Sequence, residues 1–263
     1  MKNVVITGST RGLGLEMTKE FLKAGCNVTI SGSKPQSFDK AKEELKEFEN
    51  QFIYIACNVR NIDDIKNLWI KSVEKWGRVD IWINNAGQNY PRESFWETPD
   101  KYIDAVVDTN IKGVMYGSKV AAENMLNQGH GQIWNMEGLG SNGMIIEQTI
   151  LYGTSKCALT YFSEGLAKEL KDSPVKIGRL SPGMMLTEFI TKSPTGEISS
   201  VTQDKRFRRV FNTLGDKPET VAKFFVPRIL NNTKQGAHLV WLTNLKSTKR
   251  FIMAAFNKRE LLK

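Results

Sequence analysis

The stretch TGSTRGLG at residues 7–14 decides the fold of this chain. It follows the apolar run NVVIT (3–7) and leads into a segment in which Leu13, Met17 and Phe21 recur at helical spacing. A strand, a glycine-rich turn and a helix in this order are typical of dinucleotide binding, because the glycines permit a tight turn and the helix N-terminus attracts phosphate. Glycines end many strands, so it is this context that makes the motif informative.

Apolar and amphipathic runs alternate along the rest of the chain. Further strands are expected at 27–31, 52–57, 79–84, 132–136, 175–180 and 237–242, and further helices near 37–49, 61–76, 99–127 and 152–171. Such alternation requires parallel strands joined by right-handed crossovers. The sequence therefore predicts an α/β, doubly wound Rossmann fold of about seven parallel strands flanked by helices. No linker divides the 263 residues, which favours one domain over 1–263 with a basic amphipathic tail at about 244–263.

Composition limits the classes of function. The net charge of +9 favours an anionic ligand, but the basic residues are scattered, so no nucleic-acid partner is expected. Cys26, Cys57 and Cys157 lack metal-type spacing, so no metal site is predicted and a reducing compartment is favoured. No apolar run approaches the ~20 residues of a membrane span. With the first strand so close to Met1, we expect a cytoplasmic protein, or one of the plastid stroma if a transit peptide has been removed.

The second expected strand bears on the choice of cofactor. It ends in TISGSKP (29–35) without the acid that would bind a ribose 2′-hydroxyl, and Lys34 lies close by. With Arg11, this favours NADPH over NADH, although both cations could instead be ordinary solvated residues. The cofactor residues expected from the glycine loop and this strand end are Gly8, Ser9, Thr10, Arg11, Gly12, Leu13, Gly14, Ser33 and Lys34.

YGTSK (152–156) places Tyr152 and Lys156 one helical turn apart on the same face. A nearby ammonium would lower the pKa of the tyrosine and make its phenol a usable proton donor. Such a pair is common on protein surfaces. Its position after the fifth strand of a dinucleotide fold is what suggests a catalytic role.

Five motifs occur in the order seen in the short-chain dehydrogenase/reductase family. They are TGSTRGLG, NNAG (84–87), DTNIKG (108–113), YGTSK and SPGMMLTEF (181–189), and the resemblance covers nearly the whole chain. It implies that Tyr152 is the general acid/base, that Lys156 binds the nicotinamide ribose, and that Asn110 holds a water in a proton relay. The further cofactor contacts that it implies are Asn58, Val59, Asn85, Ala86, Gly87, Pro182, Gly183, Met185 and Thr187.

Two positions depart from the family pattern. Asn58 replaces the acid that usually contacts adenine, although an amide can still hydrogen-bond that base. The usual catalytic serine falls on Gly138, and the nearest hydroxyl is Ser141 in MEGLGSNG (136–143). This run and the tail TNLKSTKRFIMAAF (243–256) resemble the chlorophyll b reductase branch of the family.

The branch resemblance implies NADPH-dependent reduction of the C7 formyl group of chlorophyll b. Ser141 would then supply the catalytic hydroxyl, and Glu137 would either face the substrate or point into solvent. The alternatives are a reductase of the same family acting on another bulky hydrophobic ketone, and a non-catalytic NADP(H)-binding protein.

A hydrophobic substrate would contact loops beyond the carboxyl ends of the strands, at 88–99, 138–151 and after Gly183. The side chains expected to face it are Tyr90, Phe95, Trp96, Leu139 and Met144, unless some of them pack under their own loops. Residues 190–214 are expected to form a lid. The tail at 244–263 would lie on a membrane or on a neighbouring subunit, and a homodimer or homotetramer is expected.

Overall fold

Consecutive apolar residues form strands that are buried on both faces, as in β1, where Val4, Val5 and Ile6 are at most 1% exposed. The computed structural model describes residues 1–193, 196–254, 256 and 259–262. These residues form a seven-stranded sheet in the order β3-β2-β1-β4-β5-β6-β7, with every neighbouring pair parallel. The strands are β1 (Asn3–Ile6), β2 (Asn27–Gly32), β3 (Phe52–Ala56), β4 (Ile81–Asn84), β5 (Gly131–Met136), β6 (Val175–Ser181) and β7 (Ala237–Val240). The predicted doubly wound fold is confirmed.

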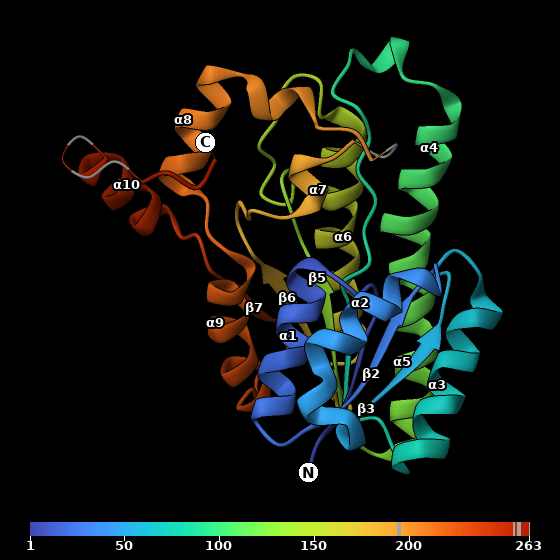
Figure 1. The fold of residues 1–263 in the computed structure, drawn as a ribbon. Helices are drawn as coiled ribbons and strands as arrows, with labels where there is room; N and C mark the ends of the chain where they lie inside the picture. Colours follow the sequence, from blue (N-terminus) through green and yellow to red (C-terminus); the bar gives the residue numbers. More distant parts are fainter. Residues whose placement is uncertain (194–195, 255, 257–258, 263) are drawn as a thin grey trace.

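Helices cover both faces of the sheet (Figure 1). One face packs against α1 (Gly12–Lys23), α2 (Gln36–Leu45) and α9 (Pro218–Leu230). The other packs against α3 (Ile62–Trp76), α5 (Gly113–Gln128) and α6 (Ile150–Glu169). The remaining helices are α4 (Asp100–Val106), α7 (Glu188–Thr191), α8 (Lys205–Leu214) and α10 (Asn244–Met253).

The strand order reverses between β1 and β4, which opens a crevice at their carboxyl ends. The glycine loop after β1 and the turn after β4 meet at this crevice, where the N–H of Asn85 donates to the hydroxyl of Thr7 at 3.0 Å. This topology is what positions the candidate site.

Two expected helices differ from the observed ones. The helix predicted over 99–127 is interrupted between α4 and α5 by a π-helical segment, Val107–Lys112. The expected helical tail is helical only to Met253, and residues 255, 257, 258 and 263 lie outside the described residues. None of the helices formed by the described residues is long and apolar enough to cross a membrane.

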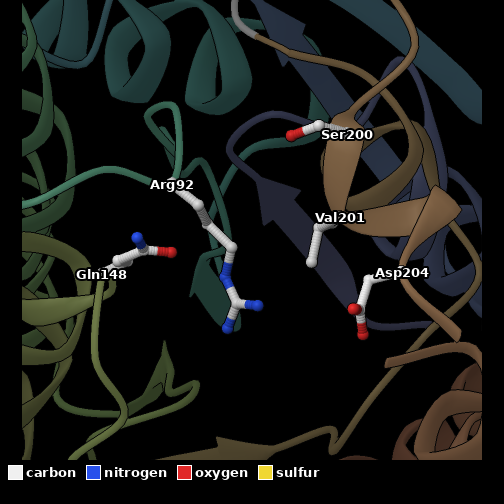
Figure 2. Close-up of a pocket in the computed structure, with 5 residues that line it drawn as sticks. All are labelled: Arg92, Gln148, Ser200, Val201 and Asp204. Carbon is white, nitrogen blue, oxygen red and sulfur yellow. The ribbon is translucent and has the colours of Figure 1, made fainter. Parts of the chain in front are cut away.

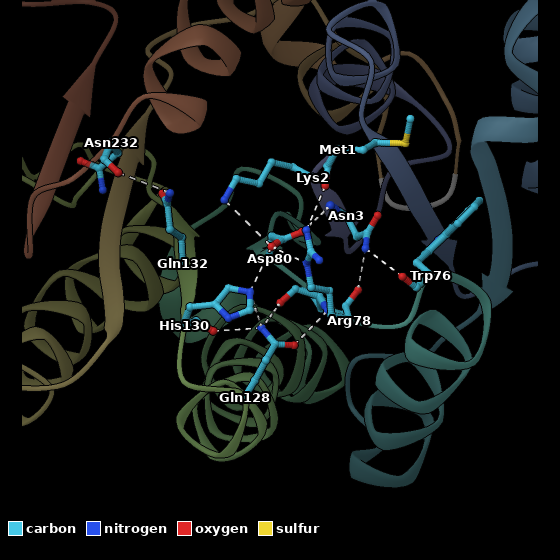
Figure 3. A network of polar contacts seen from close by, with 11 residues as sticks. Met1, Lys2, Asn3, Trp76, Arg78, Asp80, Gln128, His130, Gln132 and Asn232 are labelled. Atoms are coloured by element: carbon cyan, nitrogen blue, oxygen red, sulfur yellow. Dashed lines mark hydrogen bonds and ion pairs between the residues drawn. The ribbon is translucent and has the colours of Figure 1, made fainter.

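A buried carboxylate ties together the amino ends of three strands, and Figure 3 shows its polar contacts. Asp80, with a side chain 2% exposed, accepts a hydrogen bond from the N–H of Asn3 at 2.8 Å. It also lies 3.0 Å from the guanidinium of Arg78, 3.1 Å from the imidazole of His130 and 4.0 Å from the ammonium of Lys2. These contacts hold the starts of β1, β4 and β5 in register.

We expect Asp80→Ala to lower the free energy of unfolding by about 1–3 kcal/mol, because the buried amide of Asn3 loses its acceptor while the half-exposed cations of Lys2 and Arg78 regain water. Urea denaturation measures this change. The control is Glu74→Ala, which removes an exposed ion pair with Lys71 and should change stability by less than about 1 kcal/mol. Equal losses in the two variants would contradict the interpretation.

Candidate active site

The glycine loop and the turn after β4 form one cradle. Gly8 has a φ of +62°, and a Cβ there would lie 2.8 Å from the Cα of Ala86. A Cβ on Gly14 would lie 2.5 Å from the carbonyl oxygen of Gly8. The side-chain amide of Asn85 donates to the carbonyl oxygens of Thr7 and Gly8 at 3.0 and 2.9 Å. Since α1 begins without a side-chain cap or an acidic first turn, its free N–H groups can bind a phosphate.

A hollow of about 430 Å³ lies beside this cradle, lined by the glycine loop, the start of α2 and the loop before α7. Across it, the guanidinium of Arg11 pairs with the carboxylate of Glu188 at 3.0 Å. Ser33 and Lys34 are exposed at the end of β2, where the strand carries no carboxylate. Sequence reasoning missed Glu188, which lies 177 positions from its partner.

The residues after β3 occupy the outer side of the crevice. Asn58 is exposed, and its side-chain oxygen accepts from the N–H of Arg60 at 3.2 Å. Val59 is buried, and a Cβ on Gly113 would lie 2.9 Å from its side chain. Asn58 thus keeps an exposed amide, whereas the side chain of Val59 belongs to the core.

Tyr152 and Lys156 lie on α6, as predicted. The buried ammonium of Lys156 donates to the carbonyl oxygen of Met136 at 2.9 Å and lies 5.7 Å from the centre of the Tyr152 ring. Burial lowers the pKa of Lys156 to about 8, against an opposing effect of the Glu137 carboxylate. The expected lowering of the Tyr152 pKa is wrong for this arrangement, because burial raises the pKa of that phenol.

Asn110 is fully buried in the π-helical segment. Its side-chain oxygen accepts from the N–H of Gln88 at 2.7 Å, and its amide donates to the carbonyl oxygen of Gln88 and to the hydroxyl of Ser155, both at 3.0 Å. The side chain therefore joins the turn after β4 to the helix that carries Tyr152 and Lys156. The water-relay role implied for Asn110 remains a prediction.

Gly138, rather than Ser141, lies beside the Tyr152 hydroxyl. A Cβ built on Gly138 would lie 2.5 Å from that oxygen. The hydroxyl of Ser141 instead accepts from the N–H of Gly138 at 3.1 Å and donates to the carbonyl oxygen of Lys156 at 3.4 Å. These contacts argue against Ser141 as the catalytic hydroxyl, since they direct it to the backbone of its own loop and of α6.

We expect Gly138→Ala to lower turnover by about tenfold, because the added methyl must displace the Tyr152 hydroxyl. Steady-state rates with a carbonyl substrate measure the effect. Gly165→Ala on α6 is the matched control, since a Cβ there meets nothing within 4 Å. Unchanged turnover in Gly138→Ala would show that the hydroxyl moves without consequence.

Both expectations for Glu137, a substrate-facing group or a solvent-facing one, are wrong. Its carboxylate is buried and accepts from Thr160 at 3.0 Å, from Arg179 at 3.0 Å and from the hydroxyl of Ser181, and it lies 2.9 Å from the imidazole of His238. Burial alone would raise the pKa of Glu137, but the hydrogen bonds from His238 and Ser181 and the charge of Arg179 lower it to about 2. Glu137 therefore joins β5, β6, β7 and α6.

The loop after β6 closes over the glycine loop. Gly183 has a φ of +71°, and a Cβ on Gly12 would lie 3.6 Å from Thr187. Met185 packs against the core on the face of the sheet that α1, α2 and α9 cover, and Pro182 is buried. Phe189, which sequence reasoning missed, lies with its ring centre 5.6 Å from that of Tyr152. The side chain of Met185 therefore supports the loop from the core side, while Phe189 lies against the ring of Tyr152.

The predicted substrate-side residues fall into two groups. Tyr90 is only 8% exposed, because its hydroxyl donates to the carbonyl oxygen of Gln148 and accepts from the N–H of Leu151, both at 3.3 Å. The expectation that it faces the substrate is corrected: it supports the loop. The others remain accessible, with Leu139 half-buried and Phe95, Trp96 and Met144 exposed.

The tail is attached to the body of the protein through Asp216. Its carboxylate accepts from the guanidinium groups of Arg250 and Arg259 at 2.7 and 2.9 Å, and from the indole N–H of Trp241 at 2.7 Å. The exposed apolar side chains on and after α10 are Leu245, Phe251, Ile252, Met253 and Phe256. Contact of this tail with a membrane or with another subunit remains a prediction.

Comparisons with known proteins agree with this geometry. Residues 2–197 match the family model described as short chain dehydrogenase. The chain is 35% identical over 269 residues to chlorophyll(ide) b reductase NOL, chloroplastic, of Oryza sativa subsp. japonica, covering 98% of this chain and 76% of that protein. It is 34% identical to the probable chlorophyll(ide) b reductase NYC1 of the same organism, covering 92% of this chain but only 50% of that relative. The solved structure of ElxO with NADP bound matches with a TM-score of 0.79 at 27% identity, covering 91% of this chain and 96% of that one.

Proposed function

The chain belongs to the short-chain dehydrogenase family, and on this basis we propose that it is an NADPH-dependent reductase of a bulky carbonyl compound. The proposed substrate is the C7 formyl group of chlorophyll b or of a related formyl tetrapyrrole, which becomes a hydroxymethyl group. The observation that carries the proposal is the pair Tyr152 and Lys156 on α6, beside the crevice and its glycine cradle. The similarity to chlorophyll(ide) b reductases over 98% of the chain supports the choice of substrate.

The residues present fit a dinucleotide. Gly8 and Gly14 pack so closely against Ala86, Asn85 and the loop backbone that neither position could carry a Cβ, and the tight turn that they form at the uncapped start of α1 suits a pyrophosphate. Arg11 and Lys34, with no carboxylate at the end of β2, favour the 2′-phosphate of NADPH over NADH. In this proposal, the phosphate competes with Glu188 for the Arg11 guanidinium.

The chemistry then follows from the side chains. NADPH, when bound, supplies the hydride that reduces the carbonyl carbon. Tyr152 donates its phenolic proton to the carbonyl oxygen, and the raised pKa keeps that proton on the phenol at neutral pH. The ammonium of Lys156 stabilises the phenolate that remains. Because the Ser141 hydroxyl is hydrogen-bonded to backbone groups, we propose that Tyr152, rather than Ser141, polarises the carbonyl oxygen of the substrate.

The test is consumption of NADPH, with NADH in parallel, in the presence of chlorophyll b, chlorophyllide b and a panel of bulky ketones. Product chromatography should show a hydroxymethyl pigment formed with NADPH. Reduction of ketones without reduction of formyl pigments would favour the alternative reductase. NADPH binding without turnover of any carbonyl would favour a non-catalytic role.

We also propose a homodimer or homotetramer. The proposed pairing surface is formed by α5, which exposes Met115 and Leu126, and by α6, which exposes Tyr161 at 84%. Light scattering of the purified protein should give a mass of two or four times 29.7 kDa. A monomer at micromolar concentration would contradict this proposal.

A further inference from the structure

A second pocket lies between the three segments expected to contact the substrate. It has a volume of about 350 Å³ and is lined by Arg92, Gln148, Ser200, Val201 and Asp204 (Figure 2). These residues come from the segment after β4, the loop before α6 and the segment after β6. The pocket therefore lies on the side of the sheet where a substrate of this fold binds.

Arg92 supplies a positive charge to this pocket. Its side chain is exposed, and its guanidinium makes no hydrogen bond or ion pair with any residue in the part of the chain that the structure describes, although the Asp204 carboxylate in the same pocket acts on it electrostatically. Its guanidinium carbon lies 5.8 Å from the ring centre of Phe207. Burial lowers the pKa of Arg92, but an arginine stays charged at neutral pH. A guanidinium without a hydrogen-bonded partner in the described residues is available to bind an anion from outside the chain.

The part of the pocket wall that Gln148 forms has a strained backbone. Gln148 has a φ of +60°, which a residue with a side chain rarely adopts. The Tyr90 hydroxyl bonds both the carbonyl oxygen of Gln148 and the N–H of Leu151, the residue before Tyr152. Strain of this kind concentrates at ligand sites. The two hydrogen bonds of Tyr90 also fix the position of the pocket relative to Tyr152, because they join Gln148 in the pocket wall to Leu151 on α6.

We propose that Arg92 binds a carboxylate of the substrate, remote from the carbonyl group that is reduced. This inference rests on the proposed reductase function. The planar guanidinium can bind both carboxylate oxygens at once. Asp204, which caps α8 through the N–H of Phe207, adds one negative charge to the wall, and this charge disfavours a phosphate with two negative charges more than a carboxylate with one. The substrate class is therefore a bulky carbonyl compound with a free acid group. Among formyl tetrapyrroles, we expect the pigment with a free carboxylic acid to be preferred over its long-chain ester.

The test compares each acid with its own methyl ester. The pairs are chlorophyllide b and 3-oxo-5β-cholanoic acid, each against its methyl ester, with NADPH as reductant. We expect the wild-type kcat/KM to favour the acid by about tenfold or more, as for a charge-assisted hydrogen bond. Arg92→Met should abolish this preference by lowering the value for the acid alone, and Arg92→Lys should retain part of it.

Arg206→Ala is the matched control, because it removes an exposed cation of α8 and should leave the preference intact. Equal kcat/KM for acid and ester in the wild type, or equal loss in Arg206→Ala and Arg92→Met, would overturn the inference. An Arg92-dependent preference for the oxo acid, with no pigment reduced, would reject the proposed pigment but keep the carboxylate site. Calorimetry can also measure the binding of the acid and of the ester to the Tyr152→Phe variant with NADPH, which makes the test independent of turnover. If the acid bound no more tightly than the ester, the inference would be refuted.

Discussion

Replacing Tyr152 by phenylalanine is expected to reduce turnover by about 10²-fold or more while NADPH binding stays nearly unchanged. The substitution removes only the phenolic hydroxyl, which lies beside Gly138 and is the proposed proton donor. The ring keeps its packing against Phe189 and its place above Lys156. The effect should therefore fall on kcat rather than on folding or on cofactor affinity.

Single-turnover rates with a carbonyl substrate, together with NADPH titration by fluorescence, separate the two quantities. Tyr161→Phe is the matched control, because it makes the same chemical change on the same helix at a side chain that is 84% exposed. Its turnover should equal that of the wild type. Normal turnover in Tyr152→Phe would reject the proposed mechanism.

Replacing Glu137 by glutamine is expected to lower the free energy of unfolding at pH 7 by about 3 kcal/mol. The carboxylate is buried among Thr160, Arg179, Ser181 and His238, and its removal leaves the mostly buried guanidinium of Arg179 without its buried counterion. Glu164→Gln is the matched control. It removes a 60% exposed carboxylate from the same guanidinium and should cost less than about 1 kcal/mol.

The effect of Glu137 should also depend on pH. Because its pKa in the folded protein is about 2, below the ordinary 4.5, its stabilising contribution is present above about pH 4.5 and is lost as the pH falls toward 2. Urea denaturation from pH 7 to pH 3 should therefore show the wild-type and Glu137→Gln curves converging in acid. If the difference between the two curves stayed constant over this range, the partners of Glu137 would not lower its pKa in the folded protein.

Local sequence patterns predicted those parts of the site that depend on neighbours in the chain. The strand, turn and helix at residues 3–23 follow from consecutive apolar residues, glycines and helical spacing. Tyr152 and Lys156 share a helix face because they are one turn apart. The π-helical segment around Asn110 was missed, because a single π-helical turn within a helix does not change the local pattern of residues. The side-chain partners of Asn110, Gln88 and Ser155, lie 22 and 45 positions away and could not be predicted either.

The sequence by itself determined the α/β fold, the glycine cradle and the tyrosine–lysine pair, because backbone propensity and short spacing encode them. Only the tertiary structure decided the roles of Gly138, Ser141, Glu137 and Tyr90, because each depends on which distant side chain meets it. The sequence around Glu137 does not indicate whether its carboxylate faces solvent or a buried arginine. Its partners lie on strands and helices 23 to 101 positions away, and packing alone brings them to it.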